Sequence, residues 1–357
     1  LANAITLLTG GSDVSGDSYA CVFARARRIP LRSDVIRTAA GRAGTDTLAS
    51  VPALLDKRLV FVTGKGGVGK STAAIALGLL AARHGRRTVV AELSSQDRVQ
   101  RVFDHQDARF TEIELAPGLF TISIDPEHAM DEYLRVKAGA LGHVLGSSRL
   151  FQTFAMATPG MRELLTLGKV WELAQLQRRT RGATPYDLVI VDAPATGHGV
   201  GLLRTPRTFA DIARVGPIAH QGRTIADTIA DRRFTGIVAV ALPEEMPVNE
   251  TLSLGQALAE DRLGLDLVIL NAVYPIRFAD SEVQELSGGL SRTRSTVSRS
   301  ALRAALSEHA RAETQREQRN RLSQGLSAPL VELEYVFCEQ LGLAELGALA
   351  DQLDRQL

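Results

Sequence analysis

A glycine-rich loop near residue 64 joins a short apolar segment to an amphipathic helical one. The loop reads Gly64, Lys65, Gly66, Gly67, Val68, Gly69, Lys70, Ser71 and Thr72. Glycines let consecutive backbone N–H groups converge on phosphate oxygens, and the start of the following helix adds a positive dipole. In this pattern Lys70 is placed to bridge the β- and γ-phosphates of a nucleotide, and Ser71 is placed to bind Mg²⁺. The sequence therefore predicts a nucleotide phosphate site at the end of an apolar strand, residues 59–63.

Apolar segments rich in β-branched residues alternate with longer helical segments from residue 59 onward. The predicted strands are 59–63, 88–92, 119–124, 187–192, 236–242, 265–270 and 330–335. Strands that are apolar on both faces and separated by helices indicate a parallel sheet that is covered on both sides. This pattern predicts an α/β fold, a doubly wound, mostly parallel sheet of the P-loop NTPase type.

The long intervals between strands and the start of the chain define the expected domain organisation. Residues 126–185 are expected to be helical throughout and to form a helical subdomain inserted between strands, with further helices at about 200–233. A polar, arginine-rich helix is expected at 300–322. Residues 1–56 show neither the strand period nor the helix period, so we expect a poorly ordered N-terminal extension before a P-loop ATPase domain of residues 57–357.

The composition limits the partners and the cell compartment expected for this fold. The 41 basic and 40 acidic side chains nearly cancel, so no overall field attracts nucleic acid or anionic lipid, and we expect no nucleic-acid partner. Cys21 and Cys338 are the only cysteines, too few for a disulfide framework, which fits a reducing cytoplasm. No segment has the roughly 18–20 consecutive apolar residues that a membrane span needs, so no integral membrane segment is expected. The sequence therefore predicts a cytoplasmic protein.

A second motif follows the predicted strand 187–192, whose last residue is Asp192. The segment continues as Ala193, Pro194, Ala195, Thr196, Gly197, His198 and Gly199. It resembles switch II of the arsenite-pump and tail-anchored-protein-targeting (anion-transporting) ATPase family, and Lys65 at the second position of the loop resembles that family's deviant Walker A motif. The resemblance covers about residues 59–353 and includes the segment 243–251, which is similar to the family's Pro-Glu and Glu-Thr pattern.

The resemblance implies a role for each matched residue. Asp192 would hold the water shell of Mg²⁺, and the Gly197 amide would sense the γ-phosphate of ATP. Lys65 would reach the nucleotide of a second chain in a face-to-face dimer, unless it is only a solvated loop lysine. Asn271, if it is not simply a turn residue at a strand end, would recognise adenine, for which its amide supplies a donor and an acceptor. Pro329 would lie near the loop that packs on the base.

The sequence departs from the family pattern at switch I. The family's aspartate, which orients the attacking water, falls on Ser94, and a hydroxyl cannot take the proton of that water at neutral pH. Glu92, at the tip of its predicted strand, and Asp97 are the nearest carboxylates, so hydrolysis would use one of them or be slow. Asp125, which precedes Pro126, is interpreted as the start of a helix.

These features predict a dimeric ATPase that uses ATP and Mg²⁺ and pairs with itself or with a paralogous subunit. The cysteines typical of the arsenite and tail-anchor members are absent, so the cargo stays unidentified, and an unknown protein client or membrane partner is expected. Met130, Met156 and Met161 in the helical interval either form an apolar client surface or belong to the core. Two alternatives stay open: a low-turnover nucleotide-binding regulatory subunit, suggested by Ser94, and a partition- or septum-type ATPase that binds DNA, through the arginine-rich residues 292–321, or a membrane.

Overall fold

The computed structural model describes residues 52–93, 99, 103, 110–135, 158–179, 182–194, 199–213 and 216–357. The chain divides into two compact units, which are Ala49–Tyr335 with Gly342–Leu357, and Leu1–Leu48 with Val336–Leu341. The sheet and the candidate site both belong to the first unit. Predictions about residues 1–51 lie outside the described residues.

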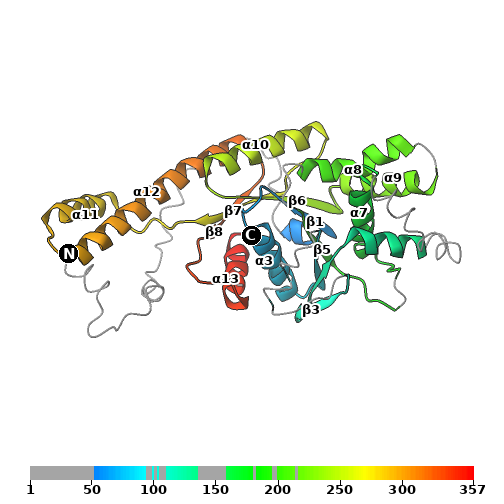
Figure 1. The fold of residues 1–357 in the computed structure, drawn as a ribbon, viewed down its shortest axis with the longest axis horizontal. Coiled ribbons are helices and arrows are strands. Elements are labelled where there is room, and N and C mark those ends of the chain that lie inside the picture. Colours follow the sequence, from blue (N-terminus) through cyan, green and yellow to red (C-terminus); the bar gives the residue numbers. More distant parts are fainter. Residues whose placement is uncertain are drawn as a thin grey trace. The chain divides into compact units, whose positions relative to one another are not determined.

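An eight-stranded sheet forms the centre of the first unit (Figure 1). Its strands are β1 (Leu59–Thr63), β2 (Thr88–Glu92), β3 (Ile113–Ala116), β4 (Leu119–Ser123), β5 (Leu188–Asp192), β6 (Thr235–Ala241), β7 (Leu267–Val273) and β8 (Leu330–Glu334). The order across the sheet is β3-β4-β2-β5-β1-β6-β7-β8, and every neighbouring pair is parallel except β3 and β4. β1, β2, β4, β5 and β6 are buried along their whole length. The doubly wound, mostly parallel fold predicted from the apolar segments is therefore confirmed.

The apolar pattern does not predict β3. This strand has four residues, lies at the edge of the sheet and is only partly buried. It pairs antiparallel with β4 through a tight turn at Gly118, whose φ is 78°. A short edge strand with a partly solvated face has too few apolar positions to differ from a loop in sequence.

Helices cover both faces of the sheet. They are α2 (Pro52–Leu55), α3 (Lys70–Arg83), α7 (Met161–Leu173), α8 (Gly199–Ala213), α9 (Pro217–Ala230), α10 (Glu245–Glu260), α11 (Asp280–Arg292), α12 (Thr296–Gly325) and α13 (Leu343–Gln356), and residues 126–135 are also helical. α3 packs with α13 on one face, where Gly78 of α3 approaches Val90 and Ile190 (Figure 1). α7 to α10 and α12 contribute to the core on the other face, and α11 packs on α12. Within the described ranges, no helix combines the length and apolar character that crossing a bilayer requires.

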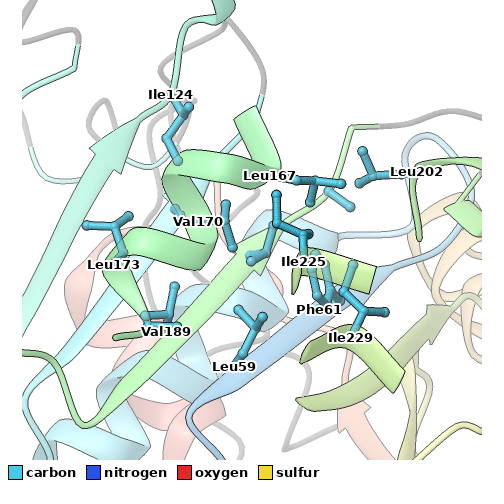
Figure 2. Close-up of a cluster of buried hydrophobic side chains, with 14 of the residues drawn as sticks. Leu59, Phe61, Ile124, Leu167, Val170, Leu173, Val189, Leu202, Ile225 and Ile229 are labelled. Carbon is cyan, nitrogen blue, oxygen red and sulfur yellow. The ribbon is translucent and has the colours of Figure 1, made fainter. Parts of the chain in front are cut away.

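The core divides between the two faces with the two-residue period of a strand. Leu59, Phe61 and Val189 point toward α7, α8 and α9 and belong to one buried cluster (Figure 2). The helices contribute Leu167, Val170, Leu173, Leu202, Ile225 and Ile229 to this cluster. Val60 and Val62 alternate with these positions and are equally buried, at 1% and 0% exposed. Burial on both faces explains why the central strands read as unbroken apolar segments.

The helical interval is shorter than predicted. The sequence pattern predicts helix throughout 126–185, but α7 ends at Leu173 and the described residues between it and β5 are not helical. Arg58, next to β1, explains part of this difference. Its guanidinium donates to the carbonyls of Ala174 (3.0 Å) and Tyr186 (2.7 Å), and these bonds satisfy an irregular backbone that periodicity alone does not detect.

Two predicted boundaries can be compared with the structure. Asp125 starts a helix as predicted, because its carboxylate accepts the N–H groups of Glu127 (2.8 Å) and His128 (3.1 Å). Burial by itself would raise the pKa of Asp125, but the bonds from this first turn hold the pKa below its ordinary value. The predicted extension 1–56 ends too late, because α2 lies within it and Leu54 is only 4% exposed.

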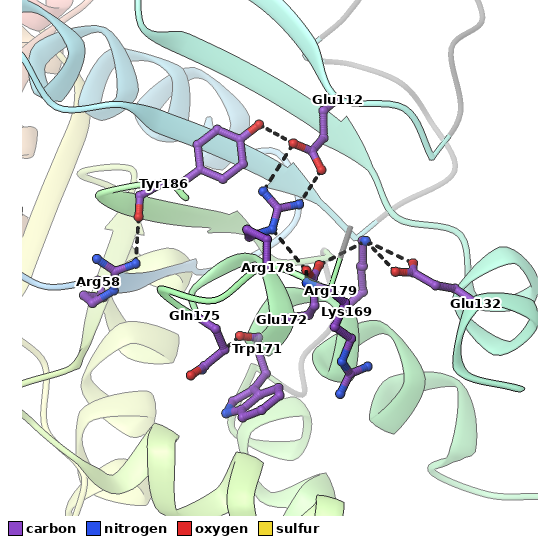
Figure 3. A network of polar contacts seen from close by, with 10 residues as sticks. All are labelled: Arg58, Glu112, Glu132, Lys169, Trp171, Glu172, Gln175, Arg178, Arg179 and Tyr186. Atoms are coloured by element: carbon purple, nitrogen blue, oxygen red, sulfur yellow. Dashed lines mark hydrogen bonds and ion pairs between the residues drawn. The ribbon is translucent and has the colours of Figure 1, made fainter. Parts of the chain in front are cut away.

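A network of charged and polar side chains fastens α7 to its neighbours (Figure 3). Its members are Glu112, Glu132, Lys169, Glu172, Arg178 and Tyr186. The Arg178 guanidinium, 1% exposed, contacts Glu172 at 3.0 Å and Glu112 at 2.5 Å. Tyr186, just before β5, donates to Glu112 at 2.6 Å, and Lys169 of α7 lies 3.1 Å from Glu172. The network therefore ties α7 to the segments before β3 and β5.

The pKa values in this network reflect burial and charge acting in opposite directions. Burial raises the pKa of Glu112, but hydrogen bonds from Arg178 and Tyr186 outweigh it and hold the pKa below its ordinary value. The same balance lowers the pKa of Glu172, where the charge of Lys169 is the largest opposing effect. Burial would lower the pKa of Arg178, yet its two carboxylate partners raise it. All three groups are therefore charged at neutral pH.

Candidate nucleotide-binding site

The glycine-rich loop leaves the sheet at its centre. β1 lies between β5 and β6, with β2 and β4 beyond β5 and with β7 and β8 beyond β6. The strands that follow β1 in sequence therefore lie on both sides of it, so the strand order reverses at β1. In open α/β sheets, ligands bind outside the C-terminal ends of the strands at such a reversal. The loop joins the C-terminal end of β1 to α3, which begins at Lys70. The strand, loop and helix that the phosphate motif requires are therefore present.

Two glycines of the loop occupy positions that exclude a side chain. Gly64 has a φ of 145°, and a Cβ there would stand 2.3 Å from the carbonyl oxygen of Val240 in β6. Gly69 has a φ of 91°, and a Cβ there would stand 2.2 Å from the amide nitrogen of Asn271 in β7. The positive φ values and the close packing on β6 and β7 explain why glycine stands at both positions.

The rest of the loop is arranged around the start of α3. Val68 is buried and anchors the loop, whereas Gly66 and Gly67 are exposed. Gly69 is the N-cap of α3 and has no side chain to bond the first N–H groups of the helix. The N–H groups of this first turn, which includes Thr72, therefore point toward the loop, where an anion would accept them.

The two side chains that open α3 are held by contacts within the site. Lys70 is 7% exposed, and its ammonium group donates to the carbonyl of Lys65 at 2.8 Å. The Ser71 hydroxyl donates to a carboxylate oxygen of Asp192 at 2.5 Å. Asp192 ends β5, the strand beside β1, and is 5% exposed. The structure thus brings together the two residues predicted to hold Mg²⁺, and their hydroxyl and carboxylate oxygens are ligands that this ion accepts.

Lys65 is engaged within its own chain. Its ammonium group lies 2.8 Å from a carboxylate oxygen of Glu250 and also contacts the sulfur of Met246. Both residues belong to the first half of α10, which follows β6. Because β6 lies beside β1, α10 emerges next to the loop although Glu250 is 185 residues away in sequence. The reach of Lys65 into a second chain stays a prediction.

Glu92 lies at the same edge of the sheet. It is the last residue of β2, in register with Asp192 of β5, and it is 1% exposed. Its carboxylate accepts the N–H of Val99 at 3.3 Å. A catalytic role for Glu92 stays a prediction. Its position at the C-terminal edge of the sheet, beside Asp192, suits that role. The other predicted residues of the switch segments, Ser94, Asp97, Gly197 and His198, lie outside the described residues.

Asn271 joins the site, but Pro329 does not. The amide nitrogen of Asn271 donates to the carbonyl of Val68 at 2.9 Å, so this side chain lies against the loop. Pro329 precedes β8, and its carbonyl accepts the N–H of Val268, the second residue of β7. It therefore lies at the N-terminal edge of the parallel strands, whereas the loop leaves from the C-terminal edge. The position of Pro329 contradicts its predicted role near the base. A residue near the base would follow the C-terminal end of a strand, whereas Pro329 precedes the N-terminal end of β8.

Sequence reasoning gave no role to two residues that support the edge of the site, Glu250 and Gln315. The Gln315 amide, from α12, donates to the carbonyl of Ala272 (3.2 Å) and accepts the N–H of Tyr274 (2.7 Å). Ala272 follows Asn271 and has a φ of 60°, which alanine rarely adopts. Gln315 has no sequence signal, because it is one polar residue in a long polar helix. Glu250 does have a sequence signal, since it lies in the segment that resembles the family's Glu-Thr pattern.

Comparisons with known proteins agree with this geometry. The family model described as Anion-transporting ATPase matches residues 57–214, which include the loop and Asp192. ATPase BagA of Mycobacterium tuberculosis is 31% identical over 240 residues, covering 65% of this chain and 70% of that protein. ATPase GET3 of Podospora anserina is 24% identical, covering 66% of this chain and 79% of that protein. A putative arsenical pump-driving ATPase of Halobacterium salinarum is 27% identical, covering 62% of this chain and 35% of that protein. With its loop, sheet order and Asp192 in the matched region, the chain belongs to the anion-transporting ATPase family.

Proposed function

We propose that the protein binds ATP and Mg²⁺ at the loop between β1 and α3 and hydrolyses ATP to ADP and phosphate. The observation that carries this proposal is the 2.5 Å contact of the Ser71 hydroxyl with the Asp192 carboxylate. It joins the start of α3 to the end of β5, beside a loop built to bind phosphate. Relatives named as ATPases support the same activity.

In the proposed reaction, water attacks the γ-phosphorus while the bond from that phosphorus to the bridging oxygen of ADP breaks. Loop N–H groups and the Lys70 ammonium would bind the β- and γ-phosphates and stabilise the charge that develops on their oxygens. Ser71 and Asp192 would hold Mg²⁺, which neutralises phosphate charge when it is bound. Asn271, fixed against Val68, would offer its amide oxygen to the adenine base.

Glu92→Gln is expected to lower kcat by about 100-fold or more while ATP affinity changes only a few-fold. The reason is that Glu92, buried beside Asp192, would orient the attacking water, an interaction made mainly in the transition state. Single-turnover hydrolysis and the binding of a fluorescent ATP analogue measure the two effects. Glu114→Gln, on the edge strand β3, is the control and should keep both values.

Other outcomes of the Glu92 experiment assign the role elsewhere. Unchanged turnover in Glu92→Gln would make Asp97→Asn the next variant to measure, since Asp97 is the other carboxylate near switch I. Negligible turnover by the unaltered protein would contradict the ATPase proposal and favour a regulatory nucleotide-binding subunit.

The functional unit is proposed to be a dimer, formed with a second copy or with a paralogous chain. Two chains would close face to face across their loops, with Lys65 of each beside the nucleotide bound to the other. Lys65 suits this role because its side chain is 30% exposed at the ligand edge of the sheet, whereas Lys70 is folded over its own loop.

Lys65→Ala is expected to leave ATP binding within a few-fold but to weaken nucleotide-driven dimerisation by about 100-fold or more. The estimate follows because each lost hydrogen bond to a charged group contributes about 1.5–3 kcal/mol and a dimer loses two. Light scattering with a non-hydrolysable ATP analogue measures the association. Normal dimerisation together with full hydrolysis would mean that Lys65 is only a loop lysine.

A helical layer beside the site is the proposed place for a protein client or membrane partner in the cytoplasm. A cavity of about 100 Å³ lies between the helix 126–135, α7 and α9, and its lining is mainly apolar. Met130 and Met161 both line it, which fits an adaptable apolar surface. Met130 is also only 5% exposed, so it serves the core at the same time.

A further inference from the structure

The pair formed by Lys65 and Glu250 is accessible rather than part of the core. Their side chains are 30% and 46% exposed, and the ammonium and carboxylate groups are 2.8 Å apart. Met246, 62% exposed, lies against the same ammonium group. Exposed ion pairs of this kind contribute little to stability, so this one can break without unfolding the chain.

The positions of both partners are fixed by the packing around them. Gly64 presses against the backbone of β6 at Val240, which holds the loop beside the start of α10. α10 is anchored by the buried residues Val248 and Thr251, which flank Glu250, and the Thr251 hydroxyl donates to the carbonyl of Pro247 at 2.8 Å. A rigid helix therefore presents the Glu250 carboxylate to the loop, and the contact does not depend on a flexible segment.

The Lys65 ammonium group has three N–H donors, but a side chain that is held 2.8 Å from Glu250 of its own chain is not free to extend toward a nucleotide bound to a second chain. We infer that Glu250 is a positioning residue: it holds Lys65 within its own chain, and Lys65 must exchange this carboxylate for the partner's phosphate when two chains close. The inference rests on the proposed role of Lys65 in the dimer. It adds that the Glu250 carboxylate opposes closure of the dimer by holding Lys65 in its own chain. Glu250 thereby sets how much nucleotide is needed for closure.

Charge gives the exchange its direction. Without nucleotide, the Glu250 carboxylate is the acceptor that faces Lys65. The pair neutralises the positive charge of Lys65, which would otherwise repel the Lys65 of a second chain. The phosphates of a bound nucleotide carry more negative charge than one carboxylate and form stronger charge-assisted hydrogen bonds with the ammonium group. Exchange is therefore favourable only when the partner chain holds nucleotide.

The test compares Glu250→Gln with a matched control, Glu245→Gln, in the full chain. Glu245 is an exposed glutamate in the first turn of the same helix. In the nucleotide-free protein, labelling of Lys65 by an amine-reactive reagent, read by peptide mass spectrometry, should accelerate about 1.4- to 5-fold in Glu250→Gln, the factor that an exposed ion pair contributes. With a non-hydrolysable ATP analogue, dimerisation measured by light scattering should tighten about 2- to 25-fold, because each dimer breaks two such pairs.

The outcomes separate this inference from the dimer proposal. Glu245→Gln should match the unaltered protein in both measurements, and Glu250→Asp, which keeps the charge, should stay close to it. If the unaltered protein dimerises with the analogue but Glu250→Gln associates no more tightly, the inference is overturned and the dimer stands. Unchanged Lys65 labelling in Glu250→Gln also overturns it. If the unaltered protein remains a monomer with the analogue, the dimer of two identical chains is wrong, and the inference for that dimer fails with it.

Discussion

Lys70→Ala is expected to weaken ATP binding by about 100-fold or more and to abolish measurable turnover. Lys70 would form hydrogen bonds with two phosphates, and hydrogen bonds to charged groups contribute about 1.5–3 kcal/mol each. The structure places the lysine for this role, since its side chain is 7% exposed and already folds over the loop to the carbonyl of Lys65. Calorimetric titration with ATP and single-turnover hydrolysis measure the two losses.

Lys57→Ala is the matched control for Lys70→Ala. Lys57 is also a buried lysine next to β1, at 8% exposed, but it lies before the strand, where it pairs with Asp266 and donates to the carbonyl of Thr235 at 3.1 Å. Lys57→Ala should lower the melting temperature and leave ATP affinity unchanged. Lys70→Ala should weaken ATP binding and leave the melting temperature unchanged. Wild-type affinity and rate in Lys70→Ala would contradict the phosphate site.

Arg178→Met is expected to destabilise the fold by about 3–5 kcal/mol, the usual cost of removing one partner from a buried ion pair. The substitution leaves the carboxylates of Glu172 and Glu112 without the guanidinium that contacts both, and Glu172 is 1% exposed. Methionine replaces the apolar part of the side chain, so the lost charge is the main change. For a chain of 357 residues, whose entropy of unfolding is about 2.1 cal/mol/K per residue, the expected fall in melting temperature is roughly 4–8 °C.

Arg179→Met is the control for the Arg178 experiment. Arg179 is the next residue, and its guanidinium lies over the ring of Trp171, 5.6 Å from the ring centroid. Losing such a contact costs about 1 kcal/mol or less. Equal melting temperatures for the two variants would show that the network in Figure 3 does not stabilise α7 as its contacts indicate.

The elements that the sequence predicts correctly are those whose signal is local. The central strands are buried on both faces, so their apolar segments identify them without knowledge of their neighbours. Asp125 starts a helix through its own bonds to the next turn, and such a cap is contained in a few consecutive residues. The edge strand β3 and the end of α7 at Leu173 lack local signals, and the sequence pattern gives both incorrectly.

The candidate site divides in the same way. The sequence by itself determined the phosphate loop, because the positive φ values at Gly64 and Gly69 and the helix that follows are requirements of the local backbone. It also gave Asp192 as the end of an apolar strand. Only the tertiary structure decided that Asp192 meets Ser71, since that contact depends on β5 lying beside β1.

Tertiary packing also decided where the remaining side chains point. Lys65 meets Glu250 because β6 brings α10 to the loop, and Asn271 meets Val68 because β7 lies next in the sheet. Pro329 falls at the opposite edge because β8 begins there. The physical reason is the same in each case: a sequence pattern reports how one element is buried, whereas the partners of a polar side chain depend on the order and direction in which separate elements pair.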